Sequence, residues 1–289
     1  MVLKHPSLFL ISALFFTFFL TTHVRASMST ASAANAINTQ LYASSKVPTI
    51  FVYGYSGTHR SSDYLINQSV TNSAATRALT ATISRKGAVS FTGKLNNQNP
   101  MVQVLLQNNR PSVPQEAGWL VHLLKVLHTK YHVDDYNAVG HSEGSVAWVY
   151  ANTVLSDVNR RPQLNKLVTI AGHFNGWIGG PGKGVNPNTN TLDDEGRPKY
   201  LNTEYKKMLN NNSQIPIGVS VLNIYGNLQD GSHSDGRVTN ESSESLKYLL
   251  TDQIASYQTA EIHGHAQHSQ LHQNKEVVDK MDTFLWGKD

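Results

Sequence analysis

The chain has 289 residues, a formal net charge of +4 and no cysteine. A chain of this length can bury one large core, and the lack of cysteine excludes disulfide bonds, thiolate metal ligands and a cysteine nucleophile. Its basic residues form no Lys/Arg-rich run with interleaved aromatic residues, so the sequence gives no indication of nucleic-acid binding.

The N-terminal segment has the layout of a secretory signal peptide. Lys4 precedes the apolar run SLFLISALFFTFFL at 7–20, and Val24 and Ala26 supply the small residues of a cleavage site. The run is shorter than the about 20 apolar residues that a transmembrane helix needs. We therefore predict a signal peptide over 1–26, with an uncleaved N-terminal anchor as the alternative. Either one places the folded part outside the cytoplasmic membrane, secreted or at the cell surface, and leaves open an association with the membrane or cell envelope.

The rest of the chain divides into a short polar segment and one domain. Residues 27–46 are rich in Ser, Ala, Asn and Thr, and we predict a linker or N-terminal extension there, before a domain at 47–289. Short β-rich apolar runs predict strands at 47–53, 79–84, 88–92, 101–106, 136–139, 164–171, 219–225 and 257–262. Helical spacing of apolar residues predicts helices at 61–73, 113–131, 145–159, 242–250 and 273–285.

This alternation of strands and helices predicts an α/β fold with a mostly parallel central sheet and helices on both faces. In such sheets the ligand site lies at the carboxyl ends of the strands. The loops that should converge there follow Tyr53, Val139, Ala171, Tyr225 and Ile262. The stretch at 172–200 is rich in Gly, Pro and Asn and is too long for an ordinary connection. We predict a lid or substrate wall at 172–200, and a passive surface insertion is the alternative.

The run Gly140-His141-Ser142-Glu143-Gly144 fits the pattern G-x-S-x-G. A predicted strand precedes it and a predicted helix follows it, which is the context that a nucleophile elbow needs. Small residues two before and two after the serine let the backbone turn sharply and hold the hydroxyl exposed at the end of the sheet. The sequence therefore predicts a serine hydrolase.

A serine hydroxyl needs a base and a third group that orients the base, and in this fold the chain order is serine, acid, histidine. The tail supplies both partners in that order. Two aspartates, Asp230 and Asp235, follow the strand at 219–225, and four histidines follow the last strand: His263, His265, His268 and His272. Clustered histidines can also bind a metal ion. The chain has no cysteine and no H-E-x-x-H or H-x-x-E-H pattern, so we predict no metal site.

Four stretches of the chain resemble the exported cell-surface α/β-hydrolase family of Gram-positive bacteria, a domain of unknown function. They are VGHSEGSVAW, TIAGHFNGWIG, LNIYGNLQDGSHSDGRV and AQHSQLHQNKEVVDKMDTFLWGK. The resemblance runs from about residue 47 to the C-terminus. It implies an α/β-hydrolase fold and an esterase- or lipase-like triad, with no defined natural substrate.

By this resemblance Ser142 is the nucleophile, Asp235 the acid and His268 the general base. Asp230 is the alternative acid because it also precedes a glycine on the same loop, and His272 follows close behind the base. Either aspartate could instead serve only a turn, since Asp-Gly is a strong turn sequence.

The oxyanion hole of such a site is made by two backbone N–H groups, which here belong to Glu143 and Tyr55. The loop that carries Tyr55 is similar to the H-G-x-G-G run of many lipases, with Tyr53 in place of the histidine and Ser56 in place of a glycine. The Tyr53 hydroxyl could replace the brace that the histidine makes. A charged Glu143 side chain within about 4–6 Å of the imidazole would raise its pKa, unless the side chain points away and pairs with a polar group.

These residues together predict an exported serine hydrolase that cleaves a small-molecule carboxylic ester through an acyl-enzyme, with no cofactor. Two alternatives stay open. The chain could be a weak or inactive hydrolase scaffold used for cell-surface binding, since a fold does not determine a function. The same triad could also serve acyl transfer, or the cleavage of thioesters or amides.

Overall fold

The computed structural model describes residues 36–95, 98–157, 162–180, 190–250 and 253–288. The predicted signal peptide at 1–26 lies outside the described residues, and so does 181–189 within the predicted lid or wall. The described residues all fall in one compact unit. Among them, no helix combines the length and the apolar character needed to cross a membrane.

The described part of the chain contains one sheet of eight strands, in the order β3-β2-β4-β1-β5-β6-β7-β8. The strands are β1 (Thr49–Val52), β2 (Thr76–Ile83), β3 (Val89–Gly93), β4 (Pro100–Leu106), β5 (Asp135–His141), β6 (Gln163–Ile170), β7 (Ser220–Gly226) and β8 (Ser256–Ile262). All neighbours pair in parallel except β3, which runs antiparallel to β2 at the edge. The mostly parallel sheet predicted from the sequence is confirmed.

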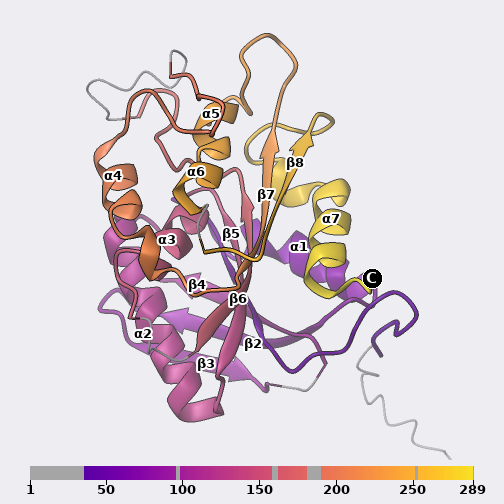
Figure 1. Cartoon of the computed structure of the whole chain (residues 1–289). Coiled ribbons are helices and arrows are strands. Elements are labelled where there is room, and N and C mark those ends of the chain that lie inside the picture. The colour runs from indigo at the N-terminus through magenta and orange to yellow at the C-terminus, as the bar shows by residue number, and fades with distance from the viewer. Residues whose placement is uncertain (1–35, 96–97, 158–161, 181–189, 251–252, 289) are drawn as a thin grey trace, which may run out of the picture. The chain divides into compact units, whose positions relative to one another are not determined.

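Helices lie on both sides of this sheet, as Figure 1 shows. They are α1 (Arg60–Thr71), α2 (Val113–Tyr131), α3 (Glu143–Asn152), α4 (Thr203–Leu209), α5 (Asn240–Glu244), α6 (Leu246–Leu250) and α7 (Lys275–Trp286). Two 3₁₀ helices span Asn212–Gln214 and Leu271–Gln273.

The core has two apolar layers, one on each face of the sheet. On one face Leu65 of α1 and Met281 of α7 belong to the same buried cluster as Phe51 of β1. On the other face Leu123 of α2 packs in a cluster with Ile50, the neighbour of Phe51 on β1. Successive side chains of a strand point to opposite faces, so a strand covered on both sides must be apolar at every position. This is why the central strands read as continuous apolar runs.

The helix after the elbow ends earlier than the sequence predicts. α3 stops at Asn152, whereas the prediction ran to Asn159. Thr153 is the C-cap residue, with φ −117° and ψ −76°, and its hydroxyl donates to the Val149 carbonyl oxygen of the preceding turn. The N–H of Leu155 then bonds to the carbonyl oxygen of Tyr150, five residues back, so the regular helical ladder is broken.

The helix predicted at 242–250 is in fact two short helices, α5 and α6, with Ser245 between them. The Ser245 hydroxyl donates to the Ser242 carbonyl at 2.7 Å, and the Tyr205 hydroxyl donates to the Ser245 carbonyl at 2.8 Å. Such side-chain bonds to the backbone compete with the helical ladder. Tyr205 lies on α4, a helix that the sequence did not predict, because only Tyr205 and Met208 of this short segment are buried.

The segment at 36–46, predicted as part of a linker or extension, contacts the domain. The Ala43 N–H donates to the Trp286 carbonyl oxygen at 2.7 Å, and Tyr42 forms a β-bridge with Gly287. The buried Asn99 side chain accepts from the Ser45 N–H at 2.6 Å. These bonds tie the segment to the end of α7 and to the loop before β4.

Candidate active site

The elbow predicted from the sequence joins β5 to α3. Ser142 has φ 55° and ψ −122°, a strained conformation for a residue with a side chain, and α3 begins at the next residue. The flanking glycines are required by space. A Cβ on Gly140 would lie 2.5 Å from the Ser145 nitrogen, and a Cβ on Gly144 would lie 2.8 Å from the Tyr53 carbonyl oxygen. The serine is therefore held between the end of the sheet and the start of a helix.

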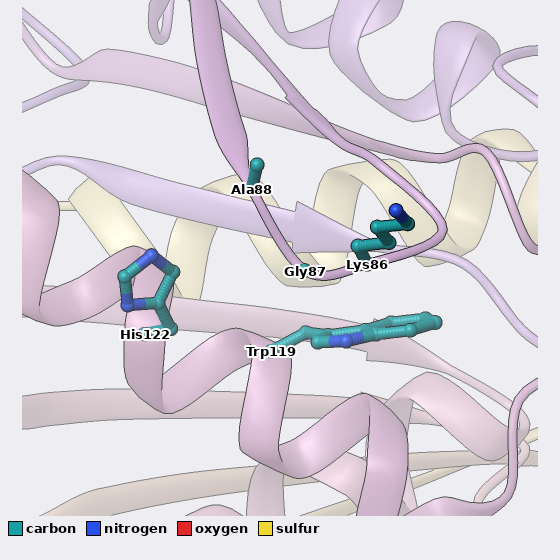
Figure 2. A pocket seen from close by; sticks show the side chains of 5 residues that line it. All are labelled: Lys86, Gly87, Ala88, Trp119 and His122. Carbon is teal, nitrogen blue, oxygen red and sulfur yellow. The ribbon is translucent and has the colours of Figure 1, made fainter.

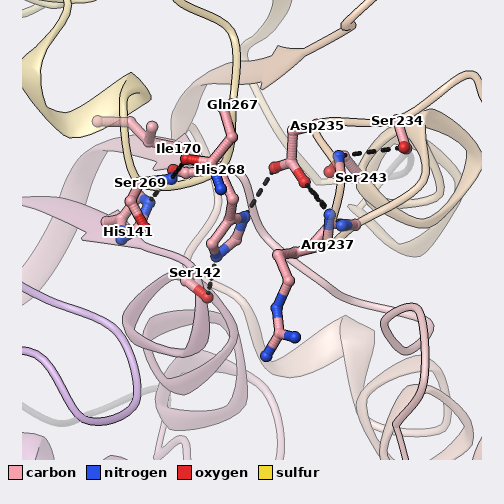
Figure 3. Close-up of polar contacts among 12 residues, drawn as sticks. His141, Ser142, Ile170, Ser234, Asp235, Arg237, Ser243, Gln267, His268 and Ser269 are labelled. Carbon is pink, nitrogen blue, oxygen red and sulfur yellow. Dashed lines mark hydrogen bonds and ion pairs between the residues drawn. The ribbon is translucent and has the colours of Figure 1, made fainter. Parts of the chain in front are cut away.

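A chain of hydrogen bonds joins Ser142, His268 and Asp235 (Figure 3). The Ser142 Oγ lies 2.9 Å from the His268 Nε2, and the His268 Nδ1 lies 2.7 Å from the Asp235 Oδ2. The three residues follow β5, β8 and β7, so the loops meet at the carboxyl edge of the sheet. The Nδ1 hydrogen can be donated to the carboxylate, which leaves Nε2 as an acceptor for the serine proton.

The carboxylate of Asp235 is held by the backbone of its own loop. Its Oδ1 accepts from the N–H groups of Arg237 at 2.8 Å and Val238 at 2.7 Å, and the residue is 1% exposed. Its carbonyl oxygen also accepts from the His268 N–H at 2.9 Å. The alternative acid, Asp230, is exposed, and its carboxylate accepts from the Ser232 N–H at 2.9 Å. Of the two aspartates, Asp235 is thus the one that contacts the histidine.

The other histidines of the tail have different surroundings. The His272 ring packs edge-on against His141 with their centroids 4.8 Å apart. His263 lies 3.4 Å from the Glu261 carboxylate, and His265 is exposed. No group of three or more His, Asp or Glu residues within the described ranges is arranged to hold a metal ion.

Two further buried histidines, which the sequence did not mark as part of the site, surround His268. The Nε2–H of His141 donates to the His268 carbonyl oxygen at 2.9 Å, and burial lowers the pKa of His141 well below its usual value. Burial and, to a smaller extent, the charge of His268 lower the pKa of His173 to about 4. Both are therefore neutral near pH 7. His141 is the last residue of β5, and His173 lies in the loop that follows β6. This place at the carboxyl end of a strand is the sequence feature that could have identified them.

The loop after β1 lies against the nucleophile. A Cβ on Gly54 would come within 2.6 Å of the Ser142 Cβ, so only a glycine lets the loop approach this closely. The backbone N–H groups of Tyr55 and Glu143 have no acceptor among the described residues. The Tyr53 hydroxyl accepts from the Leu106 N–H at 2.7 Å, which ties this loop to the end of β4. The Tyr53 hydroxyl thus braces this loop, a possibility that the sequence left open.

We expect Tyr53→Phe to lower the free energy of unfolding by about 1–3 kcal/mol, because the buried Leu106 N–H loses its acceptor. Urea unfolding followed by circular dichroism measures the change. Tyr150→Phe is the matched control, since the Tyr150 hydroxyl has no hydrogen-bond partner in the described part of the chain. Equal free energies for Tyr53→Phe and the wild type would contradict the brace.

The Glu143 side chain is 7% exposed and does not pair with a polar group, since its Oε1 has no hydrogen-bond partner among the described residues. Burial raises its pKa to about 7. Glu116 of α2 is 1% exposed, and its Oε1 likewise has no partner. Burial and the charge of Glu143 raise the pKa of Glu116 well above its usual value. The core behind the elbow therefore contains two acids that favour their neutral forms.

Two of the hollows at the surface of the described residues differ in their distance from the predicted site. One, of about 530 Å³, is lined by Ile178 of the predicted lid or wall and by the loop between β7 and α5, which we call the acid loop because it carries Asp235. Both sequence neighbours of Asp235 are among its lining residues. The other, of about 420 Å³, lies between the β2–β3 turn and α2 (Figure 2). Its lining residues are Lys86, Gly87, Ala88, Trp119 and His122. The first hollow thus lies beside the loop that carries Asp235, although Ser142, His268 and Asp235 are not among its lining residues.

Comparison with known proteins relates this fold to hydrolases. A family model described as an alpha/beta hydrolase of unknown function (DUF915) matches residues 36–288. The structure is similar to that of a gene product of Listeria innocua, at 24% identity and a TM-score of 0.75, over 83% of this chain and 93% of that one. It is also similar to a Lactobacillus plantarum protein described as a candidate cell surface hydrolase, at 21% identity and a TM-score of 0.65, over 83% of this chain and 89% of that one. No curated protein matches the chain.

Proposed function

The chain belongs to this family of alpha/beta hydrolases, and on that basis we propose that it is a serine hydrolase that cleaves carboxylic esters. The predicted α/β-hydrolase fold is confirmed by the family match and by the similarity to the Listeria structure. The observation that carries the proposal is the unbroken line of hydrogen bonds from the Asp235 carboxylate through His268 to the Ser142 hydroxyl. A serine so connected has both the base and the orienting acid that nucleophilic attack requires.

In the proposed reaction the Ser142 Oγ attacks the ester carbonyl carbon, and its proton passes to the His268 Nε2. The backbone N–H groups of Tyr55 and Glu143 stabilise the oxyanion. When the tetrahedral intermediate collapses, the alcohol leaves with the proton from His268, and an acyl group remains on Ser142. Water then attacks this acyl-enzyme, again with His268 as the base, and releases the carboxylic acid and the free serine. Asp235 keeps the imidazole in the required tautomer throughout.

We also propose that the protein acts outside the cytoplasmic membrane, with a small-molecule ester as its partner. The apolar leader at 7–20 supports export, and the description of the Lactobacillus relative fits a place at the cell surface. The domain at 47–289, with a lid or wall in 172–200, is part of the same proposal. Ile178 from that stretch lines the hollow beside the acid loop, where it could contact a bound ester.

A fluorophosphonate probe tests the proposal on the purified protein, because such probes react only with activated serines. We expect one covalent adduct, located by mass spectrometry on the peptide that contains Ser142, together with turnover of short-chain p-nitrophenyl esters. Heat-denatured protein treated with the same probe serves as the control, and it should not be labelled. No adduct and no turnover would refute the proposal and favour a binding role for the scaffold.

A further inference from the structure

The two buried acids behind the elbow occupy the starts of two helices that pack together. Glu143 is the first residue of α3, and Glu116 lies in the first turn of α2. α2 packs against α3 on the same face of the sheet. Glu143 also supplies one of the two N–H groups proposed for the oxyanion hole, so its side chain and the reacting serine share one short segment of backbone.

The groups that face this pair do not neutralise a charge on it. Among the described residues, no Lys, Arg or His forms an ion pair with Glu143 or Glu116, and neither carboxyl receives a hydrogen bond from a side chain. A further titratable neighbour is Tyr53, which directly follows β1 and whose pKa is raised by burial and by the charge of Glu116. Tyr53 is neutral at physiological pH, and its hydroxyl is bonded to the backbone of Leu106.

A buried carboxylate without a partner is costly, so the folded protein holds these acids in their neutral forms. The pKa of Glu143 is about 7 because of burial, and burial together with the charge of Glu143 raises the pKa of Glu116 well above its usual value. As the pH rises through about 7, Glu143 loses its proton. The negative charge then forms on the residue whose N–H must stabilise an oxyanion.

We propose that Glu143 is a positioning residue that supports the oxyanion hole only as a neutral acid, and that loss of its proton slows the reaction at alkaline pH. This inference rests on the proposed ester hydrolysis. The imidazolium that forms at His268 is compensated by Asp235, so the new uncompensated charge in the transition state is the oxyanion. A carboxylate at Glu143 repels that oxyanion. By Coulomb's law, two unit charges about 8 Å apart at an effective dielectric of about 20–40 interact strongly enough to change a rate by about 6- to 30-fold, and this is the scale of effect that we expect.

The pH dependence of kcat/KM for a neutral p-nitrophenyl ester tests this directly. We expect the wild-type rate to fall above about pH 7, as Glu143 loses its proton. Glu143→Gln keeps the shape of the side chain but has no proton to lose, so it should reach a plateau and exceed the wild type by about 5- to 15-fold at about pH 8.5. Glu116→Gln is the matched control, and it should keep the alkaline fall.

A second measurement tests the ionisation of Glu143 without any turnover. Between about pH 4.5 and 7 the acid is ionised in the unfolded chain but neutral in the folded one, so folded stability falls as the pH rises through this window. Glu143→Gln should therefore raise the Tm at about pH 8.5 and leave it unchanged at about pH 4.5. The same shift is expected whether or not the protein hydrolyses esters.

The outcomes separate this inference from the proposed function. A wild-type plateau at high pH, or an alkaline fall that persists in Glu143→Gln, overturns the role of Glu143 even if Ser142 is labelled and esters are cleaved. Equal Tm values for Glu143→Gln and the wild type across the pH range overturn its buried ionisation even if no ester is cleaved. If labelling and turnover are both absent but the Tm shift is present, the proposed hydrolysis is refuted, and so is the effect of Glu143 on its rate. The buried ionisation of Glu143 is then still supported.

Discussion

We expect Asp235→Asn to lower kcat/KM for a short-chain ester by about 10⁴-fold, the size of effect seen when a triad histidine takes the wrong tautomer. The Asp235 Oδ1 accepts from two backbone N–H groups, so an asparagine would keep its oxygen there. Its amide nitrogen would then face the His268 Nδ1 and make that atom an acceptor. The imidazole hydrogen moves to Nε2, where it blocks transfer of the Ser142 proton.

Asp230→Asn is the matched control, because Asp230 is the alternative acid of the same loop. Its exposed carboxylate accepts from the Ser232 N–H, and an asparagine oxygen can keep that bond. We expect kcat/KM to stay within about twofold of the wild type. Circular dichroism of both variants checks that the fold is kept. A large loss in Asp230→Asn, with activity retained in Asp235→Asn, would reverse the assignment of the acid.

The second large effect is expected from Gly226→Ala, at the point where the acid loop leaves β7. A Cβ on Gly226 would lie 2.1 Å from the Ala266 carbonyl oxygen and 3.1 Å from the Asp235 Cβ. The obstacle at Ala266 is backbone, so the loop that carries His268 must move away from the loop that carries Asp235. We expect a loss of about 1–3 kcal/mol in the free energy of unfolding and a loss of about 10²-fold in kcat/KM.

Gly264→Ala provides the comparison on the neighbouring loop, since a Cβ there would meet nothing within 4 Å. We expect its stability to stay within about 0.5 kcal/mol of the wild type. Urea unfolding and ester kinetics on both variants give the two readouts. If Gly226→Ala matched Gly264→Ala in both, the close contact between the acid loop and the base loop would not be important for the site.

Much of the fold follows from the local pattern of residues. Each central strand is apolar at successive positions because both of its faces are covered, and this pattern does not depend on the rest of the chain. The helices whose bounds were predicted wrongly, or that were not predicted, are those controlled by contacts with other segments of the chain. The break at Ser245 depends on the Tyr205 hydroxyl, and α4 itself has too few buried residues to leave a helical pattern.

The sequence by itself determined the elbow, because a sharp turn between a strand and a helix demands small residues at fixed spacing around Ser142. It also placed the acids and the histidines after the correct strands. Only the tertiary structure decided that Asp235 rather than Asp230 contacts His268, and that Ser142 meets a histidine 126 residues further along the chain. The influence of the Glu143 charge on Glu116 was likewise decided by the packing of α2 on α3. Such contacts are fixed by how separate elements pack. The sequence pattern could not predict them, because no local pattern encodes the distance between two side chains that are far apart in the chain.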